Sequence, residues 1–121
     1  MPRMHDIIID SILAVRSQLN PNKRKDVFEL FGYDFLIDED FRIWLIEVNT
    51  NPYLGIPNEY IADLLPKMLD DLVKITVDPV YPPKKVEERE NDFELVYSDL
   101  KNVNKRRPFS YDLLYPVPEL K

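Results

Sequence analysis

The segment at residues 28–55, FELFGYDFLIDEDFRIWLIEVNTNPYLG, decides how the chain folds. Two runs rich in aromatic and β-branched residues, 27–38 and 42–49, flank a short polar stretch of acidic residues. Such runs, joined by a loop of a few residues, are typical of paired β-strands. The segment therefore predicts an antiparallel β-hairpin, although its loop lacks the Asn-Gly type of turn.

The predicted register brings acidic side chains together. A turn centred between Asp40 and Phe41 places Asp34 opposite Glu47 and Leu36 opposite Leu45, and period-two alternation adds Asn49 to the face of the two acids. A slip by one residue would bury Glu47 among aromatic groups, which is costly. The other face is expected to form the core, with Phe31, Tyr33, Phe35, Trp44, Ile46 and Val48.

These three polar residues form a candidate cation site. Asp34, Glu47 and Asn49 supply only oxygen ligands, a set that suits Mg²⁺ or Mn²⁺ better than zinc. Magnesium held by one or two carboxylates normally shares the phosphates of a nucleotide. From the residues alone, an ordinary sheet in which Glu47 pairs with a lysine is an equally good interpretation.

Helical spacing flanks the hairpin on both sides. Apolar residues from Ile8 to Leu19 predict one helix that stops at Asn20-Pro21. A second helix is predicted from Asn58 as its cap, and Pro66 either kinks it or begins a further helix. Its core stripe is expected to contain Tyr60, Ile61, Leu64, Leu65, Met68, Leu69, Leu72 and Val73.

Composition bounds the remaining possibilities. With 45% hydrophobic residues, 121 residues can build one small core. A net charge of −6 argues against nucleic acid as a partner, and no apolar run is long enough to span a membrane. Asp6 and Asp10 interrupt the start of the chain, which therefore does not read as a secretory signal, and there is no cysteine. A cytoplasmic location is expected.

The tail, residues 78–121, differs from the rest. It contains six of the eleven prolines and isolated apolar clusters, so we expect an extended Pro-rich arm that docks through its apolar groups; a disordered tail is the alternative. The predicted division is 1–77 for the folded part and 78–121 for the docking arm. The apolar groups of the arm include Tyr97, Phe109, Tyr111, Leu113, Leu114 and Tyr115.

The hairpin sequence also resembles a known family. GYDFLID followed by WLIEVNTNP closely resembles the C-terminal metal-binding hairpin of the tubulin–tyrosine ligase-like family, ATP-grasp enzymes that join Tyr, Glu or Gly to tubulin. The resemblance is high over residues 28–52 and looser in the flanking helical segments. It implies an α+β fold that is part of an ATP-grasp C-terminal subdomain: a hairpin flanked by helices.

The resemblance implies roles as well. Asp34, Glu47 and Asn49 would be magnesium ligands that bridge the phosphates of ATP, and the partners would be tubulin, microtubules or a larger assembly in the cytoplasm, cytoskeleton or cilium. Nothing before residue 28 resembles the family's nucleotide clamp, and the chain holds only two glycines. We therefore expect a chain that is catalytically incomplete by itself, with no catalytic residue assigned, and that serves as a microtubule- or complex-associated structural component.

Two other interpretations stay open. The chain can be the C-terminal fragment of an active tubulin ligase, as its intact set of three ligands favours, whereas a sequence beginning with Met favours a complete small protein. It can also be a small α+β domain whose acids are only structural.

Overall fold

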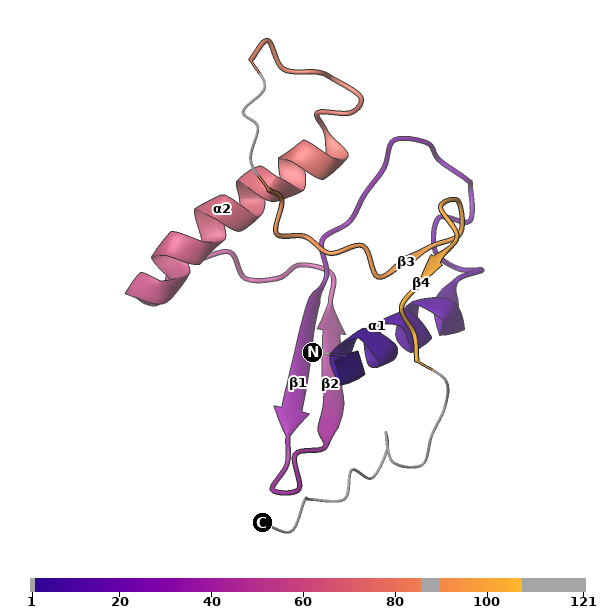
Figure 1. Cartoon of the computed structure of the whole chain (residues 1–121), viewed down its shortest axis with the longest axis vertical. Helices are drawn as coiled ribbons and strands as arrows, with labels where there is room; N and C mark the ends of the chain where they lie inside the picture. The colour runs from indigo at the N-terminus through magenta and orange to yellow at the C-terminus, as the bar shows by residue number, and fades with distance from the viewer. Residues whose placement is uncertain (1, 86–89, 108–121) are drawn as a thin grey trace.

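A computed structural model describes residues 2–85 and 90–107 of the chain. Its elements follow the order α1 (Pro2–Val15), β1 (Gly32–Ile37), β2 (Ile43–Asn49), α2 (Glu59–Thr76), β3 (Tyr97–Ser98) and β4 (Val103–Asn104). Strand β1 pairs with β2, and β3 pairs with β4, each as a two-stranded antiparallel sheet. The predicted α+β class is confirmed. Figure 1 shows α1 beside the β1–β2 hairpin, α2 pointing away from it, and the segment that follows α2 crossing back to α1.

Helix α1 ends earlier than its apolar spacing predicts. The backbone N–H groups of Gln18 and Leu19 both bond to the carbonyl of Val15, and Asn20 takes a left-handed φ of 49°, so the chain leaves the helix in a tight turn. The side chain of Asn20 then closes the next loop through two hydrogen bonds with the backbone of Arg24. The prediction that the helix continues to Asn20 was wrong by about one turn.

The β1–β2 hairpin has the predicted pairing at one end and a different pairing at the other. Asp34 lies opposite Glu47, as expected, but a β-bulge follows, and Ile46 is left without a partner in β1. Beyond the bulge Leu36 pairs with Trp44, so the predicted pairing of Leu36 with Leu45 was wrong. A bulge inserts one extra residue into one strand, which reverses the side-chain alternation on that strand.

The bulge also overturns the predicted core face. Trp44 moves to the face of Leu36 and Asp34, where its side chain is 50% exposed, and Ile46 and Val48 are exposed as well. Of the predicted set, Phe31, Tyr33 and Phe35 stay half-buried. The rings of Tyr33 and Phe35 stack at 6.1 Å between centroids, on the face away from Asp34.

The loop of the hairpin is organised by one carboxylate. Oδ1 of Asp38 accepts hydrogen bonds from the backbone N–H groups of Asp40 and Arg42, both at 2.9 Å, and Oδ2 accepts one from the indole N–H of Trp44 at 2.9 Å. Phe41 completes the loop with a left-handed φ of 59°. This network replaces the Asn-Gly turn that the sequence lacks.

Acid should open this loop only at low pH. The indole of Trp44, with the backbone donors, holds the pKa of Asp38 below its usual value of 3.8. A lowered pKa means that the bonds are fully present above pH 3.8 and are lost as the pH falls through the lowered value. The protection factor of the Trp44 indole N–H, which is its exchange rate corrected for the intrinsic dependence on pH, should therefore fall only below pH 3.8. A fall in protection at or above that pH, or an unchanged acid transition in Asp38→Asn, would contradict the assignment.

Helix α2 is continuous through Pro66, so the second helix that was the alternative to a kink does not occur. Asn58 is its cap, as predicted: the side-chain oxygen accepts a hydrogen bond from the backbone N–H of Ile61 at 3.0 Å. The predicted core stripe is not buried, because Tyr60, Leu64 and Val73 are exposed and the other members are only half-buried. No helix of the described residues is long and apolar enough to cross a membrane.

Burial in the described chain is sparse and partly polar. Ile9 is the buried apolar residue, at 1% exposure, whereas Asp6 and Asp71 are fully buried at 0%. Both carboxylates receive hydrogen bonds from the segment 91–107, which lies within the predicted arm. Of the arm's predicted docking groups, Tyr97 is half-buried in β3 and the other five lie outside the described residues.

Candidate functional site

The three predicted ligands lie together at the end of the β1–β2 hairpin away from its loop. Asp34 and Glu47 face each other across the strands, and Asn49 pairs with Gly32 in the last rung. Nδ2 of Asn49 donates to Oδ2 of Asp34 at 3.3 Å and to Oε1 of Glu47 at 3.2 Å. One amide group thus contacts both carboxylates. We call these residues the Asp34–Glu47–Asn49 cluster.

The cluster is accessible to a ligand. Asp34 and Glu47 are exposed and Asn49 is half-buried, so the carboxylates meet solvent. The amide nitrogen occupies the position between the two carboxylates. A half-turn of the amide about its Cβ–Cγ bond exchanges Nδ2 for Oδ1 and offers three oxygens to one point. That donor set fits a small hard cation such as Mg²⁺.

Among residues 2–85 and 90–107, no three His, Cys, Asp or Glu side chains gather closely enough to hold a metal ion. The cluster has only two carboxylates, and its third ligand is an amide oxygen. A site of this kind binds its cation weakly by itself and gains affinity from the oxygens of a bound phosphate.

Close packing behind the cluster fixes the chain that leaves it. A Cβ added to Gly32 would lie 3.1 Å from Cβ of Pro52 and 3.8 Å from Cβ of Asn49. The absence of a side chain at Gly32 lets the turn after β2 pack closely over the start of β1. Pro52 and Asn49 therefore both lie against the backbone of Gly32.

Replacing Gly32 with Ala should disturb this packing. Pro52 would have to move by a few tenths of an ångström, and overpacking of this size costs about 1 kcal/mol. The free energy of unfolding, measured by urea denaturation, should fall by that amount, and the side-chain amide signals of Asn49 should shift in an NMR spectrum. An equivalent change at Gly55, whose added Cβ would meet only the tip of the Tyr53 side chain, provides the comparison.

Helix α1 supports the hairpin from the other face. Oη of Tyr33 and Oγ of Ser11 are 2.8 Å apart. Because the Ser11 hydroxyl donates its proton to the carbonyl of Ile8 at 2.7 Å, Tyr33 is the donor of this bond. Tyr33 directly precedes Asp34, so the bond joins α1 to the backbone that carries the first acid of the cluster. Helix α1 also packs against β2.

Two further residues were missed by the sequence analysis. Asp6 and Asp71 both lie in helices that carry many apolar residues. The sequence signal that could have found them is an acidic residue in such a helix, because a buried acid requires a partner. Their partners Arg107 and Asp92 lie 101 and 21 residues away, a separation that no local pattern reveals.

Comparison with known proteins identifies the family of the chain. The model of the tubulin-tyrosine ligase family matches residues 1–89. Tubulin glycylase 3A of Drosophila melanogaster is 42% identical over 96 residues, 79% of this chain and 9% of the relative. Tubulin glycylase 3D of Tetrahymena thermophila is 42% identical over 77 residues, 64% of this chain and 7% of the relative. Tubulin monoglycylase TTLL3 of Danio rerio is 31% identical over 100 residues, 80% of this chain and 12% of the relative.

The chain belongs to the tubulin-tyrosine ligase family, since the family model covers more than half of it. The resemblance that the hairpin sequence suggested is thereby confirmed. The segment matched is 7 to 12% of the length of these three relatives. No solved structure gives a significant match.

Proposed function

We propose that this chain supplies the Mg²⁺-binding end of an ATP-dependent tubulin amino-acid ligase site. The observation that supports the proposal is the convergence of Asp34, Glu47 and Asn49 at one end of a hairpin. Magnesium bound there would neutralise charge on the phosphates of ATP. The relatives named tubulin glycylases favour glycine as the amino acid joined.

The chain's own residues have definite tasks in this proposal. The two carboxylates would hold the cation, and the Asn49 amide, whose nitrogen donates to both acids, would supply its oxygen as the third ligand. Gly32 and Pro52 keep Asn49 in place, and Tyr33 ties the strand to α1. The chain by itself is proposed to be catalytically incomplete. An active ligase of which this is the C-terminal part would use the same three ligands.

Cation binding by the intact chain tests the site. The single tryptophan, Trp44, lies on the face of Asp34, so its fluorescence should respond to Mg²⁺ or Mn²⁺ with ATP. Asp34→Asn should lower the affinity for the cation, measured from the fluorescence titration, by at least about tenfold. Loss of a ligand should cost no less affinity than loss of a group that only orients a ligand.

The control for this experiment is Asp63→Asn. Asp63 is an exposed acid on α2 that makes no hydrogen bond or ion pair with the other residues that the structure describes, and its replacement changes the net charge by the same amount. The control should bind as the unchanged protein does. No response of the unchanged protein, or equal weakening in both variants, would reject the magnesium site.

We also propose that the chain associates with tubulin, as a microtubule- or complex-associated component of the cytoskeleton or cilium. The relatives are named tubulin glycylases, and these names support tubulin as the partner. The exposed apolar side chains of the described residues, such as Tyr60, Leu64 and Tyr81, support docking on a larger assembly.

Co-sedimentation with microtubules checks this second proposal. The intact chain should pellet with polymerised tubulin, and Asp34→Asn should pellet equally, because docking is separate from the cation site. A chain ending at residue 107 keeps the bonds to Asp6 and Asp71, so it should fold, and reduced pelleting would assign the contact to residues 108–121. Absence of the intact chain from the pellet would remove the tubulin association.

A further inference from the structure

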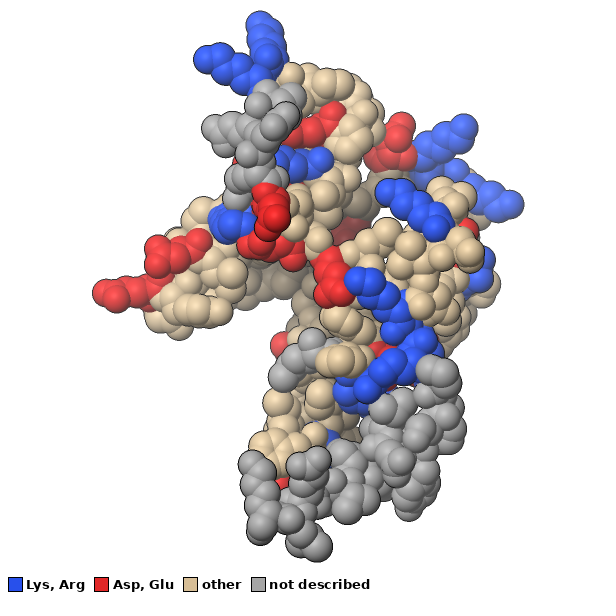
Figure 2. All heavy atoms as spheres, in the orientation of Figure 1, with Lys and Arg blue, Asp and Glu red and all other residues tan. Residues whose placement is uncertain are grey.

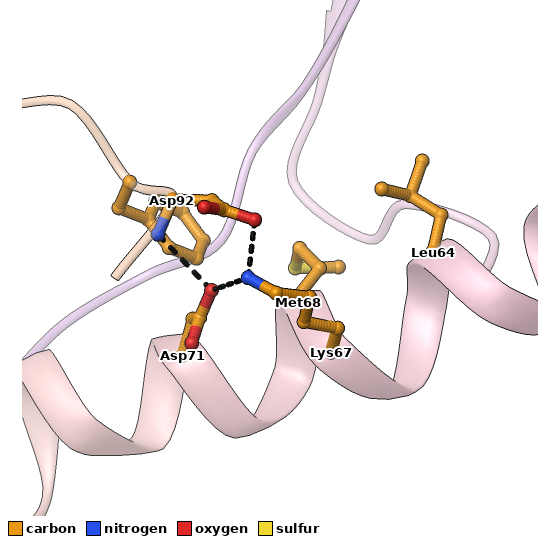
Figure 3. A pocket seen from close by; sticks show the side chains of 6 residues that line it. Leu64, Lys67, Met68, Asp71 and Asp92 are labelled. Atoms are coloured by element: carbon orange, nitrogen blue, oxygen red, sulfur yellow. Dashed lines mark hydrogen bonds and ion pairs between the residues drawn. The ribbon is translucent and has the colours of Figure 1, made fainter. Parts of the chain in front are cut away.

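The segment 91–107 is fastened to α2 by a buried carboxylate. Oδ2 of Asp71 accepts hydrogen bonds from Nζ of Lys67 at 3.0 Å and from the backbone N–H of Asp92 at 3.1 Å. The side-chain amide of Asn91 donates to the backbone carbonyl of Asp71 at 2.8 Å. Lys67 also pairs with the carboxylate of Asp92, so it lies between two acids, as Figure 3 shows.

Apolar contact accompanies this first anchor. Leu64, Met68 and Phe93 line an open pocket of about 200 Å³ beside Lys67. Leu64 and Met68 come from α2 and Phe93 from the segment, so the polar anchor and the apolar lining draw on the same two parts of the chain. The pocket therefore marks where the segment lies on the helix.

The other end of the segment is fastened to α1 by two arginines. The backbone N–H of Arg107 donates to Oδ1 of Asp6 at 2.9 Å, while its Nε and Nη2 donate to Oδ2 at 2.9 and 2.8 Å. Nε and Nη2 of Arg106 donate to Oδ1 and Oδ2 of Asp10 at 2.8 and 2.9 Å. Asp6 and Asp10 are one helical turn apart and so share a face of α1. Figure 2 shows basic side chains grouped over this region.

The middle of the segment is also tied down. Asp99, in the turn between β3 and β4, pairs with Nη2 of Arg16 at 2.7 Å, just past the end of α1. Lys105 pairs with Glu94 at 2.5 Å, and the backbone N–H of Lys105 bonds to the carbonyl of Val96. The segment is therefore a folded connection with contacts along its length.

We infer that residues 91–107 form a strap that fixes α1 relative to α2 and the hairpin, so that Asp6 and Arg107 act as positioning residues for the Asp34–Glu47–Asn49 cluster. The path runs from Arg107 to Asp6, along α1 to Ser11, and through the hydroxyl of Tyr33 to the strand that carries Asp34. The relevance of this positioning to catalysis rests on the proposed function. The connection between Arg107 and the strand of Asp34 is independent of the proposed function.

Electrostatics keeps the α1 anchor closed at ordinary pH. Burial raises the pKa of Asp6, but the hydrogen bonds and charge of Arg107, helped by the charge of Arg106, outweigh it and hold the pKa below the usual 3.8. Arg3 also faces this carboxylate at 4.0 Å. A lowered pKa contributes stability that is present above pH 3.8 and is lost as the pH falls through the lowered value. The strap should therefore stay fastened throughout the neutral range.

Site-resolved amide hydrogen exchange of the intact chain tests the strap. Arg107→Gln removes the guanidinium from Asp6. It should accelerate exchange of the backbone amide at position 107 and of the hairpin amides at 33–35. The expected factor is about tenfold or more, as for loss of one charge-assisted hydrogen bond. Amides of α2 near its Asn58 cap, and that of Arg42 in the Asp38 loop, should keep their rates because local bonds protect them.

Two variants separate the links of the path. Ser11→Ala removes the hydroxyl that Tyr33 contacts, so it should accelerate exchange at 33–35 and leave the strap amides of Asp92 and Arg107 unchanged. Lys101→Gln is the matched control. It removes one positive charge from an exposed side chain of the strap that has no bond to the other described residues, because the hydrogen bond of Lys101 to Ser98 comes from its backbone N–H. It should change neither region. If Arg107→Gln does not fold, Arg107→Lys keeps the charge but loses the paired hydrogen bonds from Nε and Nη2 to Asp6. It should give a smaller acceleration at the same amides.

Each outcome decides the inference. Acceleration confined to the strap, or equal acceleration at every amide including those of α2, would overturn it. Acceleration at the strap and at 33–35 alone would support it. Magnesium titration of the same variants gives an independent reading: if the unchanged protein does not bind Mg²⁺, the proposed function fails, while the exchange pattern still decides whether the strap positions the hairpin.

Discussion

Asp6 lies fully buried in α1, and both of its carboxylate oxygens accept hydrogen bonds from the main chain and side chain of Arg107, a residue at the far end of the described chain. A buried carboxylate is tolerated only when such donors satisfy it, and loss of one hydrogen bond to a charged group costs about 1.5–3 kcal/mol. The bond therefore binds the two ends of the described fold to each other. The strap, the seat of α1 on β2 and the support of Tyr33 all depend on it.

Polar anchors have this importance because apolar burial is limited. Ile9 is the buried apolar residue of the described chain, while large side chains such as Trp44, Ile46 and Tyr60 remain exposed. Since the hydrophobic contribution scales with the apolar area removed from water, these side chains add little to the stability of the chain as described. Directional bonds then decide the arrangement of the elements, and they decide it at particular residues rather than over a broad surface.

Sequence reasoning succeeded where the determining signals are local. The hairpin, the Asn58 cap and the pairing of Asp34 with Glu47 follow from alternation, capping chemistry and the cost of burying a carboxylate. The exposure of the α2 stripe was not predictable, because helical periodicity shows which residues share a face and not whether anything covers it. The pairing of Asp6 with Arg107 joins residues 101 positions apart, and many other acid–base pairs in the chain fit the sequence equally well.

The bulge at Ile46 shows a different limit. Up to Asp34 and Glu47 the hairpin follows the predicted register, and one unpaired residue then shifts the rest, so that Trp44 lies on the side of the acids instead of the side of Tyr33. The amino acids of β2 are the same in both registers, and only their pairing with β1 differs. The length of a strand is thus a variable that evolution can adjust separately from its composition, and an insertion or deletion of one residue can decide whether an indole or an aliphatic side chain borders a cation site.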